Sequence, residues 1–405
     1  MGFFDRLRGK PTRADFASML IRALRKAGER SELRYDPGDA RIVRIDDGKT
    51  VGVINLANMY GTFLAKPRAE REAYLRVCVR GSMTYARELP DDFDAARPDL
   101  RPKIWTRSGI EKQRLRGRLD GMGSGPDLPA VPLGEHLLVC VAYDWPESTQ
   151  SISGNDLDGW GVTVYEALEA ARENLAETTE GYAKIGEDVY SFITGDSYDS
   201  CRLLLVDQIR GFEVSGRPVA IVPNRDSVLI TGEDDEAGLA ILATVAAEQI
   251  DQNYRLSGVA LVLDGDEWVD WMPPHGHPLH ATFRDLETKF LWPEYRDQKE
   301  LLDTLHQREQ LELFVTTYSA LQKKEGGALV SYCVWGEGVD ALLPVTQKVI
   351  FMAQGRAEFA ALGDWERVRA VVGDLMEETD DYPKRFRVRQ FPDAEALAAI
   401  GSGEL

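Results

Sequence analysis

The chain has 405 residues, and its 48 Lys and Arg against 67 Asp and Glu give a formal net charge of −19. This acidic balance argues against a general binder of duplex DNA or of anionic membranes, because both attract clustered positive charge. Hydrophobic residues make up 43% and charged residues 28% of the chain, which is ordinary for a globular protein. At roughly 100–200 residues per domain, we expect two or three domains.

The four cysteines lie far apart in the sequence and form no CxxC pair, so neither a disulfide framework nor a zinc knuckle is predicted. This usage favours the reducing cytoplasm. No apolar run approaches the roughly 20 residues that cross a bilayer, so no integral membrane segment is expected. Phe3, Phe4 and Leu7 either form a tether to a membrane or partner or dock on their own domain, and the small apolar area favours docking.

Residues 1–90 are predicted to form an N-terminal α+β unit. The apolar spacing from Phe16 to Ala27 is typical of a helix that buries one face. A turn at residues 36–39 separates two predicted strands, 33–35 and 41–45, and apolar stripes at 56–64 and 74–79 predict further helices.

Residues 91–132 are rich in Pro, Gly and Arg, show no periodicity, and are interpreted as a basic linker. Eight cations lie from Arg97 to Arg118. They either contact phosphate or nucleic acid, or form a flexible loop that lies on an acidic body. The second interpretation is favoured, because Trp105 alone is interleaved for base stacking.

Residues 133–272 carry the clearest signals and are predicted to form a core unit. A buried strand is expected at 137–143, and Thr163 with Glu166 forms a capping box at the start of a helix. Strands at 218–222 and 227–231 flank Pro223-Asn224-Arg225-Asp226, which predicts a hairpin with a four-residue turn. A helix over 237–250 and a strand at 258–263 follow.

Residues 273–405 are predicted to form a C-terminal α+β unit that is a degenerate repeat of the core, although chance similarity remains the alternative. Residues 341–344 and 349–351 align without gaps on the core hairpin, and a helix is expected over 365–377. The predicted fold class is therefore α+β, built of tandem helix–antiparallel hairpin–helix units with sheets covered by helices.

The middle of the chain resembles the YtpQ-like family, a bacterial domain of unknown function. The resemblance rests on residues 137–146, Trp160-Gly161, Ala171 with Asn174-Leu175, and Val222-Pro223-Asn224-Arg225-Asp226, and covers about residues 15–263. The family usually has Ser where Asn224 stands. The resemblance implies a bacterial cytosolic α+β protein and supplies no activity.

Two stretches carry candidate chemistry. At the hairpin turn, Asn224, Arg225 and Asp226 either bind a carboxylate or phosphate ligand, or Asp226 caps the turn and pairs with Arg225. His275, His277 and His280 supply three candidate zinc ligands, with Asp264, Asp266, Glu267 and Asp270 upstream as outer acceptors. Because two prolines and a glycine interrupt the histidines, a solvated linker without a cofactor is favoured.

No Walker loop, HExxH, GxSxG or kinase signature is present in the sequence. We therefore expect a non-catalytic module that binds a protein partner or acts as an adaptor. The alternative is a hydrolase or phosphate-handling enzyme that uses Arg225, Asp226 and the histidines. The sequence determines neither the partner nor the oligomeric state.

Overall fold

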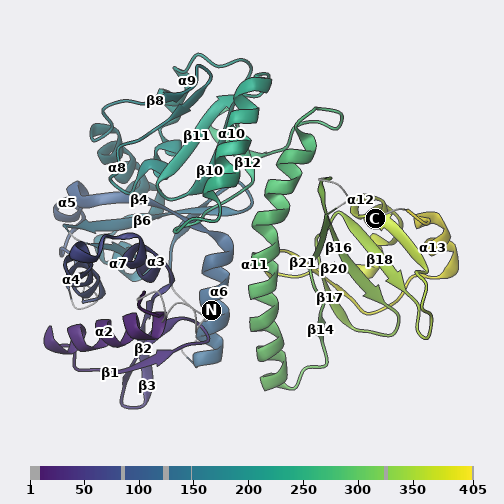
Figure 1. The fold of residues 1–405 in the computed structure, drawn as a ribbon, viewed down its shortest axis with the longest axis horizontal. Helices are drawn as coiled ribbons and strands as arrows, with labels where there is room; N and C mark the ends of the chain where they lie inside the picture. Colours follow the sequence, from purple (N-terminus) through teal and green to yellow (C-terminus); the bar gives the residue numbers. More distant parts are fainter. Residues whose placement is uncertain (1–9, 84–86, 122–126, 147, 323–326, 404–405) are drawn as a thin grey trace.

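The computed structural model describes residues 10–83, 87–121, 127–146, 148–322 and 327–403, and Phe3, Phe4 and Leu7 lie outside them. Several antiparallel sheets and their covering helices make it a mixed α+β protein, which confirms the predicted class (Figure 1). Among the described residues, no helix combines the length and the apolar character that a membrane crossing requires.

The N-terminal region has three strands between its helices, one more than predicted. The helix α2 (Arg13–Lys26) is followed by the antiparallel sheet β1-β2-β3 (Glu32–Asp36, Arg41–Asp46, Lys49–Asn55) and by α3 (Ala57–Ala65) and α4 (Arg71–Ser82). The additional strand β3 follows a turn at Asp47 and Gly48, both with positive φ (49° and 74°). An Asp-Gly pair suits such a hairpin turn, because Gly adopts this backbone region without a steric cost.

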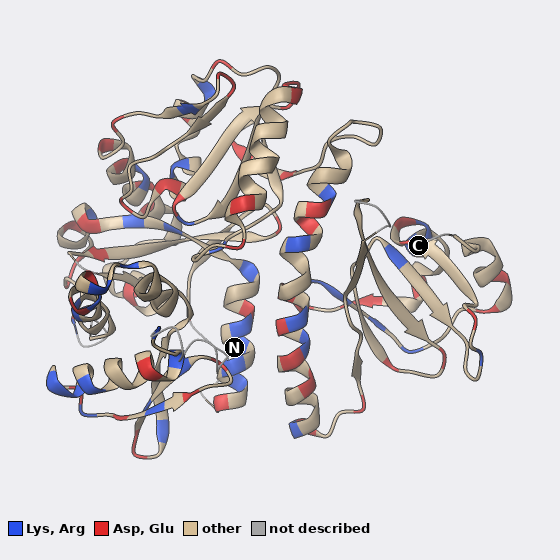
Figure 2. Cartoon of the chain, in the orientation of Figure 1, with Lys and Arg blue, Asp and Glu red and all other residues tan. Residues whose placement is uncertain are grey.

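The prediction that residues 91–132 form a linker with a flexible basic loop is wrong for the residues of this stretch that the structure describes. They form α5 (Phe93–Ala96), strand β4 (Leu100–Thr106), helix α6 (Arg107–Asp120) and strand β5 (Ala130–Leu133). Thr106 caps α6 by accepting from Gly109 N, and Gly121 ends it in the left-handed conformation. The cations of α6 contact acidic residues far away in the sequence, as in the pairs Arg116–Asp39, Arg118–Glu309 and Lys112–Glu294. Figure 2 shows Lys and Arg along α6 beside Asp and Glu along α11.

Two sheets build the middle of the molecule. The smaller joins β4, β6 (Leu137–Trp145) and β5, with β7 (Ser148–Ser151) on β6. The larger has the order β13-β12-β10-β11-β9-β8, from Glu267–Trp271, Ala260–Asp264, Pro218–Asn224, Ser227–Gly232, Val189–Ser191 and Ala183–Ile185. The predicted hairpin is confirmed as the antiparallel pair β10–β11, although β10 extends to Asn224 and leaves two residues at the tip.

Alternation along β10 places the hairpin between two apolar layers. Ala220 and Val222 face Leu137 and Val139 of the smaller sheet. Val219 and Ile221 face the helix α10 (Glu236–Gln249), which covers the other side. The remaining elements of this region are α7 (Gly154–Trp160), α8 (Val164–Glu177) with the predicted Thr163–Glu166 capping box, the 3-10 helix η4 (Asp199–Leu204) and α9 (Val206–Arg210).

The 30-residue helix α11 (His280–Glu309) lies between the middle of the molecule and the C-terminal region, with α6 beside it (Figure 1). The C-terminal region has two four-stranded sheets, β14-β17-β21-β20 and β15-β16-β18-β19. Its elements are β14 (Phe314–Val315), β15 (Ser319–Gln322), β16 (Leu329–Gly336), β17 (Ala341–Pro344), β18 (Lys348–Met352), β19 (Ala361–Asp364), α12 (Trp365–Val372), β20 (Met376–Glu378), β21 (Arg385–Val388) and α13 (Ala394–Ile400).

The second predicted hairpin, at 341–351, does not form. β17 pairs with β14 and β21, whereas β18 pairs with β16 and β19 in the other sheet. The predicted helix over 365–377 is also too long, because α12 ends at Val372 and residues 376–378 form β20. The two segments therefore share an apolar pattern but not a strand pairing, and the boundaries of the three units stay a prediction.

Candidate functional site

The tip of the β10–β11 hairpin is an ordered turn in which the predicted site residues bind one another. Asn224 Oδ1 accepts from Asp226 N at 2.9 Å, an interaction that closes a tight turn. Arg225 donates from Nε and Nη2 to both carboxylate oxygens of Asp226 at 2.9 and 3.2 Å. Its guanidinium lies 3.8 Å from the centroid of the Tyr254 ring. Burial alone would lower the pKa of Arg225, but the ion pair raises it overall.

These contacts favour the structural alternative at the turn. The guanidinium fork of Arg225 is occupied by its neighbour Asp226, and a ligand-binding role for Asn224, Arg225 and Asp226 stays a prediction. Backbone bonds also hold the tip, since Arg225 N donates to Tyr254 O at 3.0 Å and Ser200 N donates to Arg225 O at 3.1 Å.

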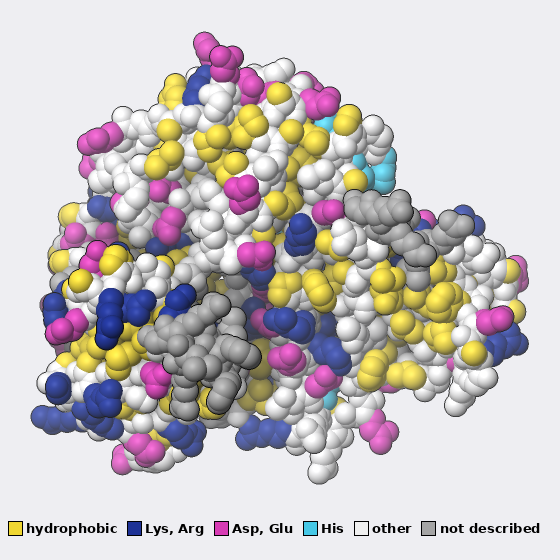
Figure 3. Space-filling model, in the orientation of Figure 1, with side chains coloured by type: hydrophobic (Ala, Val, Ile, Leu, Met, Phe, Trp, Pro, Cys, Tyr) yellow, Lys and Arg dark blue, Asp and Glu magenta, His cyan; other side chains and the backbone are white. Residues whose placement is uncertain are grey.

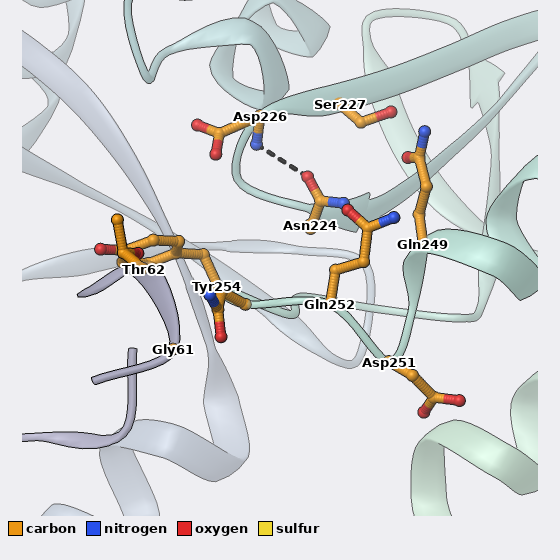
Figure 4. Close-up of a pocket in the computed structure, with 10 residues that line it drawn as sticks. Gly61, Thr62, Asn224, Asp226, Ser227, Gln249, Asp251, Gln252 and Tyr254 are labelled. Atoms are coloured by element: carbon orange, nitrogen blue, oxygen red, sulfur yellow. Dashed lines mark hydrogen bonds between the residues drawn. The ribbon is translucent and has the colours of Figure 1, made fainter. Parts of the chain in front are cut away.

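A pocket of about 540 Å³ lies beside the tip, between the hairpin, the end of α10 and helix α3 (Figure 4). Its wall includes the side-chain amides of Asn224, Gln249, Gln252 and Asn253. Gln249 Oε1 is buried without a hydrogen-bond partner. None of the described residues that line the pocket is a cation, and Asp226 and Asp251 are acidic, so the electrostatics disfavour a phosphate ligand.

The histidine loop precedes and begins α11, away from this pocket, and no residue of the loop lines it. The rings of His275 and His280 contact each other in a tilted arrangement, with centroids 4.4 Å apart. His277 Nδ1 accepts from Leu279 N at 3.1 Å, and His280 Nδ1 bonds to Pro273 O at 2.6 Å. Within the described ranges, the three imidazoles do not form a group whose ligand atoms converge.

The described residues do contain one group with converging metal-ligand atoms, and the sequence reasoning missed it. It consists of Glu135, His136 and Asp270, whose ligand atoms lie within 4.8 Å of one another. The sequence suggests Asp270 only as an outer acceptor for the histidine loop. Only the Glu135-His136 dipeptide is a local signal, because Asp270 follows 135 residues later.

A second surface feature lies between the N-terminal helices α2 and α4. They line a groove of about 600 Å³ whose apolar side chains include Met19, Ala23, Leu75 and Val79. The same groove is lined by four cations, Arg22, Lys26, Arg76 and Arg80, and by one acid, Glu72. In Figure 3, hydrophobic side chains lie between Lys and Arg side chains over the region of α2 and α4.

This cationic groove belongs to a region whose charge is opposite to that of the whole chain. Residues 1–90 contain 18 Lys and Arg against 11 Asp and Glu, a net charge of +7, whereas the whole chain carries −19. The overall charge therefore conceals a basic N-terminal region on an acidic body.

Comparison with known proteins gives a distant bacterial relative. A UPF0354 protein of Listeria welshimeri is 31% identical over 110 residues, which are 26% of this chain and 41% of the relative. The chain thus spans about two fifths of the length of that relative. No family model and no solved structure matches. Because UPF0354 is an uncharacterised family, the similarity supports a bacterial domain of unknown function, and the YtpQ-like relationship stays a prediction.

Proposed function

We propose that this protein is a cytoplasmic, non-catalytic binding or adaptor module that holds an acidic amphipathic helix of a partner protein in the α2–α4 groove. The observation that carries this proposal is the combination of an apolar floor and a cationic rim in one groove. A helix that lies in a hydrophobic groove is a common mode of peptide recognition.

The groove matches such a helix in shape. The small side chains of Ala23 and Ala27 leave depth beside α2, and Met19 and Leu75 are half-buried, so apolar area remains for a partner. Side chains at helical spacing could insert between α2 and α4, because residues three and four apart share one helix face.

The charges favour a protein over other partners. Arg22 and Lys26 on α2 and Arg76 and Arg80 on α4 would lie beside carboxylates on the polar edges of the incoming helix. Arg76 pairs with Glu72 in the free protein, and this exposed pair is weak enough to exchange for one with the partner. Duplex DNA offers phosphates to the cations but no apolar face that could cover the apolar floor of the groove. A membrane surface would require protruding apolar side chains, whereas these are recessed in a groove.

The hydrolase or phosphate-handling alternative gains no comparable support. Arg225 is bonded to Asp226, and the adjoining pocket presents amides and carboxylates. The four cysteines are free and buried, which fits the proposed cytoplasmic location.

Selection of a random peptide library on the intact protein tests the proposal without a known partner. We expect the selected peptides to be rich in Asp and Glu, with apolar residues at helical spacing. Fluorescence anisotropy should show that the double substitution R22E/R76E weakens their binding at least tenfold and that salt weakens it as well.

R34E is the matched control, because Arg34 is an exposed cation of the same basic region outside the groove lining. It should change the peptide affinity less than twofold. Peptides without acidic bias, or equal binding to the R22E/R76E protein, would contradict the proposal. It would also fail if the chain bound vesicles of phosphatidylglycerol and phosphatidylcholine through Arg22 and Arg76 but selected no peptide.

A further inference from the structure

We infer that Glu135, His136 and Asp270 bind one divalent transition-metal ion at the junction between the middle of the molecule and the C-terminal region. Glu135 and His136 lie between β5 and β6, and Asp270 lies on β13 at the edge of the larger sheet. Their three ligand atoms approach within 4.8 Å of one another. Small side-chain rotations would bring them around one ion.

The hydrogen bonds of His136 orient its free nitrogen towards the proposed ion. His136 Nδ1 bonds to the hydroxyl of Tyr382, which arrives from the segment between β20 and β21. His136 Nε2 therefore faces Asp270, 3.5 Å from Oδ2, a separation longer than a good hydrogen bond. A metal-bound histidine typically bonds an outer oxygen through its second nitrogen, and Tyr382 supplies that oxygen here.

The loop at Gly134 and Glu135 holds the carboxylate of Asp270 in place. Asp270 Oδ1 accepts from Glu135 N at 2.9 Å. Gly134 has φ +61°, and a Cβ there would lie 2.2 Å from Asp270 Oδ1. Only glycine lets the loop approach the carboxylate this closely.

The surrounding charges leave the carboxylates available. Lys384 Nζ lies 3.6 Å from Oε1 of Glu135 and also 3.6 Å from Oε1 of Glu378. Lys384 therefore keeps Glu378 as a partner when Glu135 turns towards an ion. Arg107 lies over the ring of Tyr382, 4.6 Å from its centroid.

The site opens into a pocket of about 410 Å³, which leaves coordination positions for water or a small ligand. One imidazole with two carboxylates suits Zn²⁺ or Mn²⁺, since imidazole favours zinc and carboxylates favour manganese. This donor set differs from the zinc site considered at His275, His277 and His280.

Calorimetric titration of the chelator-treated full chain with Zn²⁺ and with Mn²⁺ tests the inference. We expect saturable binding of one ion per chain, weakened at least tenfold by E135Q and by D270N. Y382F should weaken binding roughly tenfold, as expected for an outer partner of a metal ligand. Bound Co²⁺ should show no thiolate charge-transfer band, because the ligands contain no cysteine.

The double substitution H275A/H277A is the matched control and should leave the affinity unchanged. Glu135 is an exposed residue, so E135Q is expected to fold, and thermal unfolding checks this. Absence of saturable binding to the folded protein would overturn the inference. Binding that H275A/H277A abolishes and that folded E135Q and D270N retain would also overturn it.

Discussion

Two segments with nearly the same apolar pattern fold differently in this protein. Residues 220–230 form the β10–β11 hairpin, whereas residues 341–351 contribute β17 and β18 to two separate sheets. At the hairpin tip, Asn224 accepts from Asp226 N and closes the turn. The corresponding connection is Val345-Thr346-Gln347, where Val345 N donates to the Tyr295 hydroxyl and Gln347 N donates to Ser331 Oγ.

Because the apolar patterns are so similar, we infer that the chemistry of the turn contributes to which strands pair. An Asn side chain can satisfy a turn amide locally, so the chain can reverse between adjacent strands. Val and Thr are stiff, extended-favouring residues, and the amides of that connection find partners on α11 and β16 instead.

The largest loss of stability is expected when Arg202, a buried side chain that supports the hairpin, is removed. Arg202 is fully buried and pairs with Asp196 and Asp199, and its helix η4 contacts the tip through Ser200 N. Arg202→Ala should lower the free energy of unfolding by about 3–5 kcal/mol, because Asp199 would remain as an uncompensated buried charge. Urea unfolding measures this.

The control for that experiment is Arg210→Ala, which removes an exposed arginine paired with Asp207 and Asp266. We expect a loss of about 0–1 kcal/mol, as for other surface ion pairs. Equal losses in the two variants would show that the network around Arg202 does not support the hairpin.

Transplanting the turn tests the comparison directly. Replacing Asn224-Arg225-Asp226 by Val-Thr-Gln should destabilise the protein by about 2 kcal/mol, since the side-chain acceptor and the ion pair are lost together. Amide hydrogen exchange should show the loss of protection in β10 and β11. Protection that stays unchanged would mean that apolar pairing alone specifies the hairpin.

Single substitutions test the same comparison, and the losses of stability expected from them are smaller. Asn224→Ala should cost about 1 kcal/mol, and Ser331→Ala a similar amount in the other segment, because each leaves a backbone N–H without its side-chain acceptor. Exchange should accelerate near 224–227 in the first variant and near 347 in the second. Asn224→Ser keeps a neutral side-chain acceptor and serves as the control, with a smaller loss expected.

The smallest effect is a pH dependence at Asp196. Burial alone would raise the pKa of Asp196, but the hydrogen bonds and charge of Arg202 lower it overall. A lowered pKa stabilises the fold above the unfolded value near 4 and loses this contribution as pH falls through the folded value. The stability difference between the wild type and Asp196→Asn should therefore shrink on acidification below about pH 4 in urea titrations.

The failures of prediction have specific causes. Helix α6 was not predicted because it buries little apolar surface, and Leu115 is the one large apolar side chain of this helix that is fully buried. Its cations are also paired with acids far away in the sequence, such as Asp39 and Glu309. The hairpin and the capped helix α8 were predictable because their signals lie within a few residues. The metal-ligand group was not, since Asp270 meets Glu135 across 135 residues.

The sequence by itself determined the Thr163–Glu166 capping box and the turn at Asn224. These depend on interactions between residues that are neighbours in the chain, so they hold in any compact fold. Only the tertiary structure decided which sheet each of β17 and β18 joins, which acids the cations of α6 contact, and that His136 lies beside Asp270 and Tyr382. Such contacts join distant residues and form only when the whole apolar core packs.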